Sequence, residues 1–598
     1  MSITRRKFIK STALGAAALA YPSSQRGEST ATRELLHPLP YSAVELTGGP
    51  FAEHYNSIHA HYLSLSNDRL LKVYRQRAGL PAPGEGMGGW YDLQGFVPGH
   101  SLGQYISGLA RIGACTGDRS CTDKVQALVS GFAETLGPMN ESILRPQTNL
   151  WICYTLDKHF IGLIDAATLA GDSSAREVLN RVLQGAEPLL PARVHDRIGK
   201  KNPPYDEPYV MPENLFLAAD ITGNARFREL AIRYLLDRDL FDPLARGDDP
   251  FPGQHAYSHA IALSSAGQAY FKLGDNKYKT AMVNAFRLLT TTQQFASGGW
   301  GPNETFVTPH RGELFRSLTT TTDHFETPCG SYAATKLARY LLCTAVPQST
   351  EYADNLERVL FNTILVARMP DSDGDYFYYS TYSDAAKKVF YPSKWPCCSG
   401  TLVQTVADYP LNIGFTSDDG LYLVLYTPSR LRFSRGSTAI QIEQETSFPV
   451  GDTVALKLSL NTPASFTLHL RLPSWLSRPA SMGINGKPVA LTASKGSFQS
   501  IKRTWRNGDR IELTLPQDFR TEAIDDLHPE TVALMRGPVQ YVAIEGSNER
   551  TNGRRLLPSS LEQVGREIYV QNDAGRQTIF VPLRSIVNES YTSYFSKA

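Results

Sequence analysis

Thr116-Gly117-Asp118, Ala170-Gly171-Asp172, Thr222-Gly223-Asn224 and Leu273-Gly274-Asp275 mark a repeat in the first half of the chain. Each stretch follows one amphipathic segment and precedes another, at intervals of about fifty residues. A glycine just past a helix relieves the strain of a left-handed C-cap, and the Asp or Asn after it can cap the next helix. The repeat therefore predicts a series of helical hairpins.

Helical hairpins repeated around a closed ring form an (α/α) barrel, whose inner helices line a pocket. An open solenoid would show the same repeat, so closure of the ring is an inference. Helical periodicity resumes at residues 331–345 and 352–365. We therefore predict an (α/α)6 helical barrel over residues 41–412.

The hydrophobic pattern changes from a helical period to strict alternation at about residue 413. Residues 421–426, 466–472 and 510–515 alternate in this way, and Asn485-Gly486 is a strong hairpin turn. Short strands separated by turns favour antiparallel β-sandwiches. The chain is thus expected to be multidomain, α then β, with one or two antiparallel β-sandwiches over residues 413–598.

Length and charge limit the kind of protein. The 598 residues are too many for one hydrophobic core, which agrees with two or three domains. Hydrophobic residues make up 42% and charged residues 20%, a balance typical of globular proteins. The net charge of +2 provides no electrostatic reason to expect nucleic acid or an anionic membrane as a partner.

The first residues resemble an export signal. Arg5-Arg6 precedes a short apolar run at residues 13–20, and Ala18-Leu19-Ala20 supplies the small residues that a signal peptidase recognises. A membrane span would need roughly 20 apolar residues. We predict a Tat signal peptide at 1–25, a linker at 26–40 and a periplasmic or secreted protein; a disordered basic tail is the alternative.

Seven cysteines, an odd number, exclude a complete disulfide framework. Cys115 and Cys121 are close in sequence and could pair after export, while Cys153 and Cys343 lie in apolar helical contexts typical of core residues. Three cysteines remain to be explained.

These three lie in Trp395-Pro396-Cys397-Cys398-Ser399-Gly400 and in His324-Phe325-Glu326-Thr327-Pro328-Cys329. Three thiols and one carboxylate are a complete tetrahedral ligand set for Zn²⁺. A redox pair or a strained vicinal disulfide is the alternative. Spacing alone does not separate a structural zinc from a catalytic one.

The chain resembles the β-L-arabinofuranosidase family, glycoside hydrolase family 127 and its relatives, from roughly residue 40 into the sandwich region. The matching runs, which are specific in their order and combination, are Gly298-Gly299-Trp300-Gly301-Pro302-Asn303-Glu304, Glu326-Thr327-Pro328-Cys329, Leu356-Glu357-Arg358-Val359-Leu360-Phe361-Asn362 and Cys397-Cys398.

The resemblance implies a retaining mechanism in which Cys397 is the nucleophile and Glu304 the acid/base. It also implies that Glu326, Cys329 and Cys398 complete the ligands of a zinc that Cys397 shares. The ligands are spaced Glu-x-x-Cys here, where the characterised type has Glu-x-Cys, and the stretch between the two glutamates is longer. The mouth of the pocket, and with it the preferred sugar, is expected to differ.

Substrate contacts implied by the resemblance are His259, Tyr379 and Glu357. His100, in Gly99-His100-Ser101, is a further candidate. For an isolated histidine on an apolar helix the ordinary interpretation is a core residue, and only the family match favours a sugar contact for His259.

These observations predict an exported, zinc-dependent retaining glycoside hydrolase acting on plant-derived glycans, with an oligosaccharide or polysaccharide as its partner. Two alternatives stay open. One is a polysaccharide lyase of similar helical-toroid-plus-sandwich architecture, which would act by β-elimination. The other is a non-catalytic carbohydrate-binding protein with a structural zinc.

Overall fold

The computed structural model describes residues 33–137, 151–195, 206–344, 349–544, 555–573 and 575–597. The predicted signal peptide and residues 26–32 of the predicted linker lie outside these ranges. Within them, no helix combines the length and the apolar character that crossing a membrane requires.

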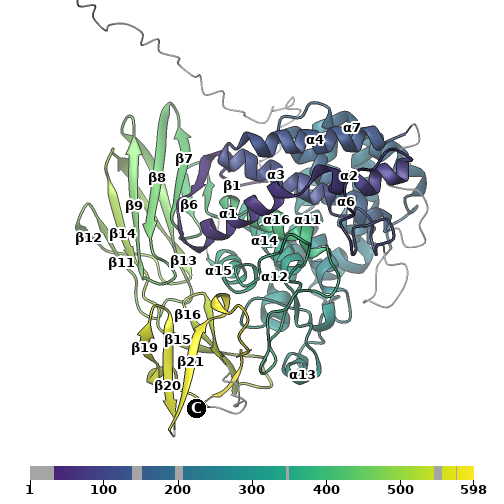
Figure 1. The fold of residues 1–598 in the computed structure, drawn as a ribbon. Helices are drawn as coiled ribbons and strands as arrows, with labels where there is room; N and C mark the ends of the chain where they lie inside the picture. Colours follow the sequence, from purple (N-terminus) through teal and green to yellow (C-terminus); the bar gives the residue numbers. More distant parts are fainter. Residues whose placement is uncertain are drawn as a thin grey trace, which may run out of the picture. The chain divides into compact units, whose positions relative to one another are not determined.

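In the described part of the chain, six helices form the inner wall of a barrel (Figure 1). They are α3 (Leu102–Thr116), α6 (Ile152–Thr168), α8 (Pro212–Thr222), α11 (Ala256–Leu273), α14 (Thr327–Thr344) and α16 (Cys398–Ala407). Each inner helix contacts the next one along the chain, and α16 returns to contact α3. The ring is therefore closed, and the open solenoid is excluded.

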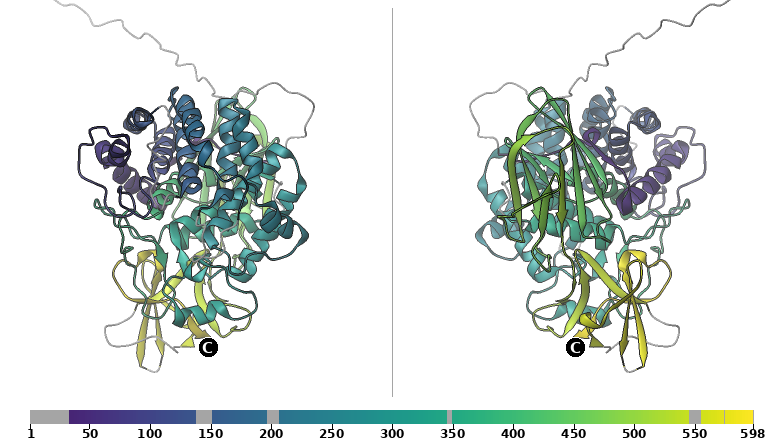
Figure 2. Two further views of the ribbon diagram at one scale, coloured as in Figure 1. Left: turned by 90° about the vertical axis from the view of Figure 1, so that its right-hand side faces the viewer. Right: turned by 90° about the vertical axis from the view of Figure 1, so that its left-hand side faces the viewer.

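A second set of helices alternates with the inner ones along the chain. These outer helices are α1 (Gly49–Ser64), α4 (Arg119–Thr135), α7 (Ala175–Ala186), α9 (Ala225–Arg233), α12 (Asn276–Leu288) and α15 (Glu351–Val359). The further helices α2 (Asn67–Ala78), α10 (Asp242–Arg246) and α13 (Glu313–Thr320) lie in the connections. Figure 2 shows the helical region and the sheets from two further sides.

Three of the four repeated glycines act as predicted. Gly117, Gly223 and Gly274 follow α3, α8 and α11 directly, and each has a φ between +71° and +79°. The next residue caps the following outer helix: the Asp118 carboxylate accepts a hydrogen bond from the Ser120 backbone N–H at 2.9 Å. Local backbone chemistry thus sets each hairpin of the barrel.

Two sheets form a sandwich beside the barrel. One sheet has the order β1-β5-β6-β10-β13 and the other β12-β11-β14-β9-β8-β7-β2. Phe433 of β7 packs against Phe466 of β10 with 5.6 Å between ring centroids, so the inner faces of the two sheets meet. The strands are β1 (His37–Pro38), β2 (Val44–Leu46), β5 (Gly414–Thr416), β6 (Gly420–Leu423), β7 (Ser429–Arg435), β8 (Thr438–Thr446), β9 (Thr453–Leu460), β10 (Ala464–Leu472), β11 (Ser481–Ile484), β12 (Lys487–Val489), β13 (Ser497–Trp505) and β14 (Arg510–Thr514).

The C-terminal strands form a separate sheet with the main order β18-β23-β16-β17-β21-β20-β19, in which β15 also pairs with β16 and β22 with β17. They are β15 (Phe519–Ala523), β16 (Thr531–Arg536), β17 (Val539–Ile544), β18 (Arg555–Leu556), β19 (Glu562–Gly565), β20 (Ile568–Asp573), β21 (Arg576–Pro582), β22 (Tyr591–Thr592) and β23 (Phe595–Lys597). The predicted order of α then β is confirmed.

The structure differs from the predicted boundaries at one point. Strand β1 lies inside the predicted linker and β2 inside the predicted barrel range, yet both pair with strands of the sandwich, β5 and β7. Three-residue or shorter strands carry too little alternation to be read from sequence. The chain therefore begins its described part in the sandwich, passes through the barrel and returns.

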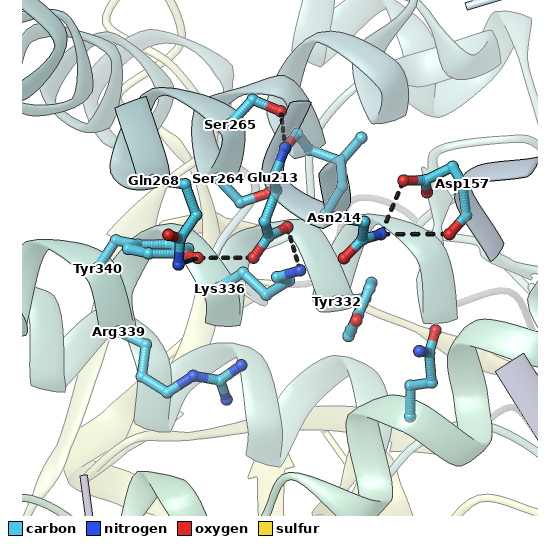
Figure 3. Close-up of polar contacts among 12 residues, drawn as sticks. Asp157, Glu213, Asn214, Ser264, Ser265, Gln268, Tyr332, Lys336, Arg339 and Tyr340 are labelled. Carbon is cyan, nitrogen blue, oxygen red and sulfur yellow. Dashed lines mark hydrogen bonds and ion pairs between the residues drawn. The ribbon is translucent and has the colours of Figure 1, made fainter. Parts of the chain in front are cut away.

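Buried polar side chains lie between α8, α11 and α14 (Figure 3). The carboxylate of Glu213 pairs with the ammonium of Lys336 and accepts a hydrogen bond from the Tyr340 hydroxyl at 2.7 Å. Gln268 in turn donates to that hydroxyl at 2.9 Å. Because buried charges are costly unless paired, this network specifies how the three helices pack together.

A second buried network joins the C-terminal ends of the inner helices. Asp408, which follows α16, binds Arg111 of α3 at 2.9 Å and Arg339 of α14 at 2.7 Å. Arg111 also reaches Asp165 of α6 at 2.8 Å. These side chains close one end of the ring, which leaves the N-terminal ends of the inner helices for a site.

Glu357 is placed differently from its sequence-based prediction. Its carboxylate is fully buried on α15, where it pairs with Arg471 of β10 and accepts a hydrogen bond from the Trp475 indole at 2.9 Å. Arg471 also binds Asp354 at 2.6 Å. Glu357 therefore joins the barrel to the sandwich, and the prediction that it contacts the sugar in the pocket is corrected. A match to a family's sequence motif identifies the residue at a position but does not determine where its side chain lies.

We expect Arg471→Met to lower the free energy of unfolding by about 3–5 kcal/mol, because it leaves the buried carboxylate of Glu357 without its partner. The measurement is thermal or urea unfolding followed by circular dichroism. Arg478→Met is the matched control, since Arg478 forms an exposed pair with Asp518 at 3.4 Å and should cost only about 0–1 kcal/mol. Equal stability of the two variants would contradict this role.

Candidate active site

Three thiols meet at the N-terminal ends of two inner helices. Cys329 lies in the first turn of α14, Cys397 is the N-cap residue of α16 and Cys398 is its first residue. The sulfur of Cys329 is 3.5 Å from those of both Cys397 and Cys398, and these two sulfurs are 4.0 Å apart. The two distant segments are thus brought together as the thiol-and-carboxylate hypothesis requires, and the seven cysteines are free thiols in the structure.

Glu326 completes this cluster. It lies in β3 (Phe325–Glu326), which pairs with β4 (Tyr379–Ser380) just before α14. One carboxylate oxygen of Glu326, Oε1, is 3.3 Å from the sulfur of Cys397. The other, Oε2, is buried and has no hydrogen-bond partner among the described residues. A buried carboxylate oxygen left in this way is costly unless a further group binds it.

The donor set fits a zinc ion. The ligand atoms of Glu326, Cys329, Cys397 and Cys398 all lie within 4.8 Å of one another, and all four residues are buried. Thiolates with one carboxylate are ligands that Zn²⁺ binds tetrahedrally. The unsatisfied oxygen of Glu326 is the observation in the structure that favours a cation at this place.

Cys397 differs electrostatically from its neighbours. Burial opposes its ionisation, but hydrogen bonding with Cys329, Cys398 and Tyr378, together with the charge of Lys158, brings the pKa of its thiol well below the usual range. Burial and the adjacent sulfurs raise the pKa of Cys329 instead. Positive partial charge at the N-terminus of α16 acts in the same direction on Cys397. Cys397 is therefore the sulfur best suited to be a nucleophile.

The second predicted catalytic residue, Glu304, lies beside this cluster. The carboxylates of Glu304 and Glu326 and the imidazole of His255 form one compact group, in which the three ligand atoms lie within 4.8 Å of one another. Glu304 has a φ of +58°, as Asn303 before it has +54°, in the turn that follows Gly301. Strained backbone of this kind is held only where the surroundings demand it, commonly at functional sites.

Two neighbours orient the Glu304 carboxylate. The hydroxyl of Tyr379 donates a hydrogen bond to Oε1, while Nε2 of His255 lies 3.7 Å from Oε2. The other ring nitrogen of His255 lies 3.2 Å from a carboxylate oxygen of Glu207. Glu207, His255 and Glu304 thus form a buried carboxylate–imidazole–carboxylate chain.

The two predicted histidines, His100 and His259, are both buried. The Nδ1 atom of His100 contacts the backbone oxygen of Val97 at 2.7 Å, and its Nε2 atom is buried with no hydrogen-bond partner among the described residues. Burial lowers the pKa of His100 to about 3, so the ring is neutral. His259 is one turn after His255 on α11, is buried, and its Nδ1 contacts the backbone oxygen of His255 at 2.9 Å.

Sequence reasoning missed four residues of this site: Glu207, His255, Tyr378 and Lys158. Tyr378 has its hydroxyl 3.3 Å from the sulfur of Cys397. The spacing of His255 and His259 on one face of a helix was a usable signal. Glu207 and Lys158 offered none, because they belong to other hairpins and reach the site only through closure of the ring.

Comparison with known families agrees with this site. Residues 43–411 match the model described as "Beta-L-arabinofuranosidase, GH127 catalytic domain", and residues 420–517 match the GH127 middle domain. The chain is 26% identical over 323 residues to a non-reducing end β-L-arabinofuranosidase of Bifidobacterium longum; the match spans 49% of this chain and about half of that enzyme, 47%.

Two solved structures share the fold. The GH127 β-L-arabinofuranosidase of Geobacillus stearothermophilus T6 superposes with a TM-score of 0.70 at 19% identity, covering 93% of this chain and 100% of that one. A structure described as a GH127 β-arabinofuranosidase superposes with a TM-score of 0.74 at 17% identity, covering 95% of this chain and 98% of that one. With the catalytic-domain model matched over the whole barrel, this chain belongs to glycoside hydrolase family 127, the β-L-arabinofuranosidase family.

Proposed function

We propose that this protein is an exported, zinc-dependent retaining β-L-arabinofuranosidase that releases sugars from plant-derived oligosaccharides or polysaccharides. The observation that carries the proposal is the meeting of Cys397 and Glu304 around the carboxylate of Glu326, at the N-terminal ends of the inner helices α14 and α16. Membership of a glycoside hydrolase family supports hydrolysis of a carbohydrate over both the lyase and the non-catalytic alternatives.

In the first step, the Cys397 thiolate attacks the anomeric carbon while Glu304 donates its proton to the leaving oxygen. The carbon–oxygen bond breaks as the carbon–sulfur bond forms, and a thioglycosyl enzyme results. In the second step, the Glu304 carboxylate takes a proton from water, whose oxygen attacks the same carbon. The carbon–sulfur bond then breaks, which restores the thiolate and leaves the product with its original anomeric configuration.

Glu326, Cys329, Cys397 and Cys398 would hold the zinc. A bound Zn²⁺ keeps coordinating sulfur deprotonated at neutral pH and makes it a better leaving group. The chain's own groups act in the same direction, since Tyr378 and Lys158 stabilise the Cys397 anion. His255 and Tyr379 position the Glu304 carboxylate.

Export belongs to the same proposal. The twin arginine and short apolar run would deliver a folded protein, with its metal already installed, to the periplasm or beyond. A fusion of residues 1–40 to a reporter that is active only after Tat export tests this. Export that is lost when Arg5 and Arg6 are both changed to lysine supports it, and a reporter that stays in the cytoplasm contradicts it.

The substrate is tested with 4-nitrophenyl glycosides. We expect β-L-arabinofuranoside to be cleaved at a far greater kcat/KM than its α anomer, because the thiolate attacks from one face of the ring only. Proton NMR of the first-formed product should show retained configuration. Cleavage of another pentofuranoside alone would correct the sugar, and ultraviolet-absorbing unsaturated products from a uronate polymer would favour the lyase.

A further inference from the structure

A second cluster of metal-binding side chains lies outside the inner ring, where α1 contacts α3 and α4 (Figure 1). It consists of His59 on α1, Asp118 at the N-cap of α4 and Cys121 in the first turn of α4. The Nε2 atom of His59 is 3.1 Å from Oδ2 of Asp118 and 3.2 Å from the sulfur of Cys121. All three ligand atoms lie within 4.8 Å of one another.

We propose that His59, Asp118 and Cys121 form a second zinc site, separate from the catalytic cluster. Zinc bonds of about 2.0 Å to nitrogen and oxygen and 2.3 Å to sulfur place tetrahedral ligand atoms roughly 3.3–3.7 Å apart. The measured distances from His59 to its two neighbours are close to this spacing. The proposal does not depend on the function assigned to the catalytic cluster.

The chemistry of the three donors suits a divalent ion. One thiolate, one carboxylate and one neutral imidazole together neutralise two positive charges. Imidazole and thiolate favour zinc and other first-row transition metals over magnesium or calcium. The three donors therefore balance the charge of a divalent ion and favour a first-row transition metal such as zinc.

Two of the three donors, Asp118 and Cys121, are held in place by the fold. Oδ1 of Asp118 accepts a hydrogen bond from the Ser120 backbone N–H at 2.9 Å, so Oδ2 is the oxygen that faces the cluster. The Cys121 side chain is fully buried, between α4 and the end of α3. Lys124 lies nearby, but its ammonium binds Asn67 at 2.8 Å and its charge stabilises the Cys121 anion.

Metal binding would change the ionisation of Cys121. A cysteine binds zinc as its thiolate, so binding would release the proton of this thiol to solvent. The side chains of His59 and Asp118 are 18% and 32% exposed, which provides an entry path and room for water as the fourth ligand.

This arrangement also bears on whether Cys115 and Cys121 pair, which the sequence left open. The sulfur of Cys115 points to the backbone oxygen of Val44 at 3.2 Å, while that of Cys121 contacts His59. The two thiols therefore have separate partners, and Cys115 is a natural control: it is close in sequence but outside the cluster.

The test measures bound metal by mass spectrometry after loading with zinc chloride and gel filtration in metal-free buffer. We expect two zinc ions per wild-type chain and per Cys115→Ser chain, and one per Cys121→Ser chain. Asp118→Asn should also bind only one zinc ion, because it removes the carboxylate that the second ion needs. Asparagine still caps the helix, so the fold of α4 should be unchanged. Both one-zinc variants should keep their hydrolytic activity. Cys398→Ser should lose the other ion instead.

Cobalt provides a second readout. Loading with cobalt chloride should produce a sulfur-to-cobalt absorption band in Cys398→Ser that is absent from the Cys121→Ser, Cys398→Ser double variant. A single zinc in the wild type, lost only on mutation of the catalytic cluster, would overturn the proposal and leave His59 and Asp118 as a simple ion pair. Two ions in Asp118→Asn and Cys121→Ser alike would overturn it too.

Discussion

Cys397→Ser is expected to reduce kcat/KM on a β-L-arabinofuranoside by on the order of 10⁵–10⁶-fold, the scale of losing a covalent nucleophile. The change keeps size and hydrogen bonding nearly constant. It removes the sulfur whose pKa the surrounding thiols, Tyr378 and Lys158 hold well below the usual range. A serine hydroxyl ionises far less readily, and it makes a much poorer leaving group in the second step. Initial rates and intact-protein mass after substrate addition provide the measurement.

The matched control is Cys398→Ser, which changes the adjacent thiol on the same helix. This variant should lose zinc and activity together, whereas Cys397→Ser should lose activity beyond what its remaining zinc explains. In the wild type, a mass increase of one sugar unit should appear with a slowly hydrolysed substrate and be absent from Cys397→Ser. Near-normal turnover by Cys397→Ser would remove this residue from the chemistry.

Glu304→Gln is expected to lower kcat/KM by roughly 10²–10⁴-fold on substrates with poor leaving groups, the range that general acid–base catalysis contributes. Glutamine keeps the shape of the side chain but can neither donate nor accept a proton. A 4-nitrophenyl substrate needs little help from an acid, so its first step should be much less affected. The zinc content should remain that of the wild type, because Glu304 is not among the four proposed ligands.

Azide distinguishes the acid/base role from a structural one. An anion that needs no general base should attack the thioglycosyl enzyme of Glu304→Gln, restore turnover of the nitrophenyl substrate and produce a glycosyl azide of retained configuration. Glu313→Gln is the control, since Glu313 lies on α13 and its carboxylate accepts a hydrogen bond from the Thr308 backbone N–H at 2.9 Å. Failure of azide to rescue Glu304→Gln, with zinc still bound, would argue against this assignment.

The site could be predicted only in part. Cys329, Cys397 and Cys398 were identified because three thiols in two short segments require a chemical explanation, and the structure brings them within 4.0 Å of one another. Glu357 was misplaced, since its side chain pairs with Arg471 of the sandwich. His255 and Glu207 were missed, although they form the chain of contacts that orients Glu304.

The local turns were determined by sequence alone. A glycine that adopts positive φ and an Asp or Asn that caps the next helix act within a few residues, so Gly117-Asp118 and its repeats predicted the hairpins and their order. The change to strict alternation near residue 413 predicted the strands for the same reason: the period of burial is a local property.

Tertiary structure decided which surfaces meet. Contact between α16 and α3 closes the ring. Strands β1 and β2 join a sandwich whose other strands lie hundreds of residues away in the sequence. His59 on α1 contacts Cys121 on α4. Such pairings depend on how whole helices and sheets pack, and their energy is spread over many side chains distant in sequence. A local pattern therefore specifies each element, while the partners of each element emerge only when the chain is folded.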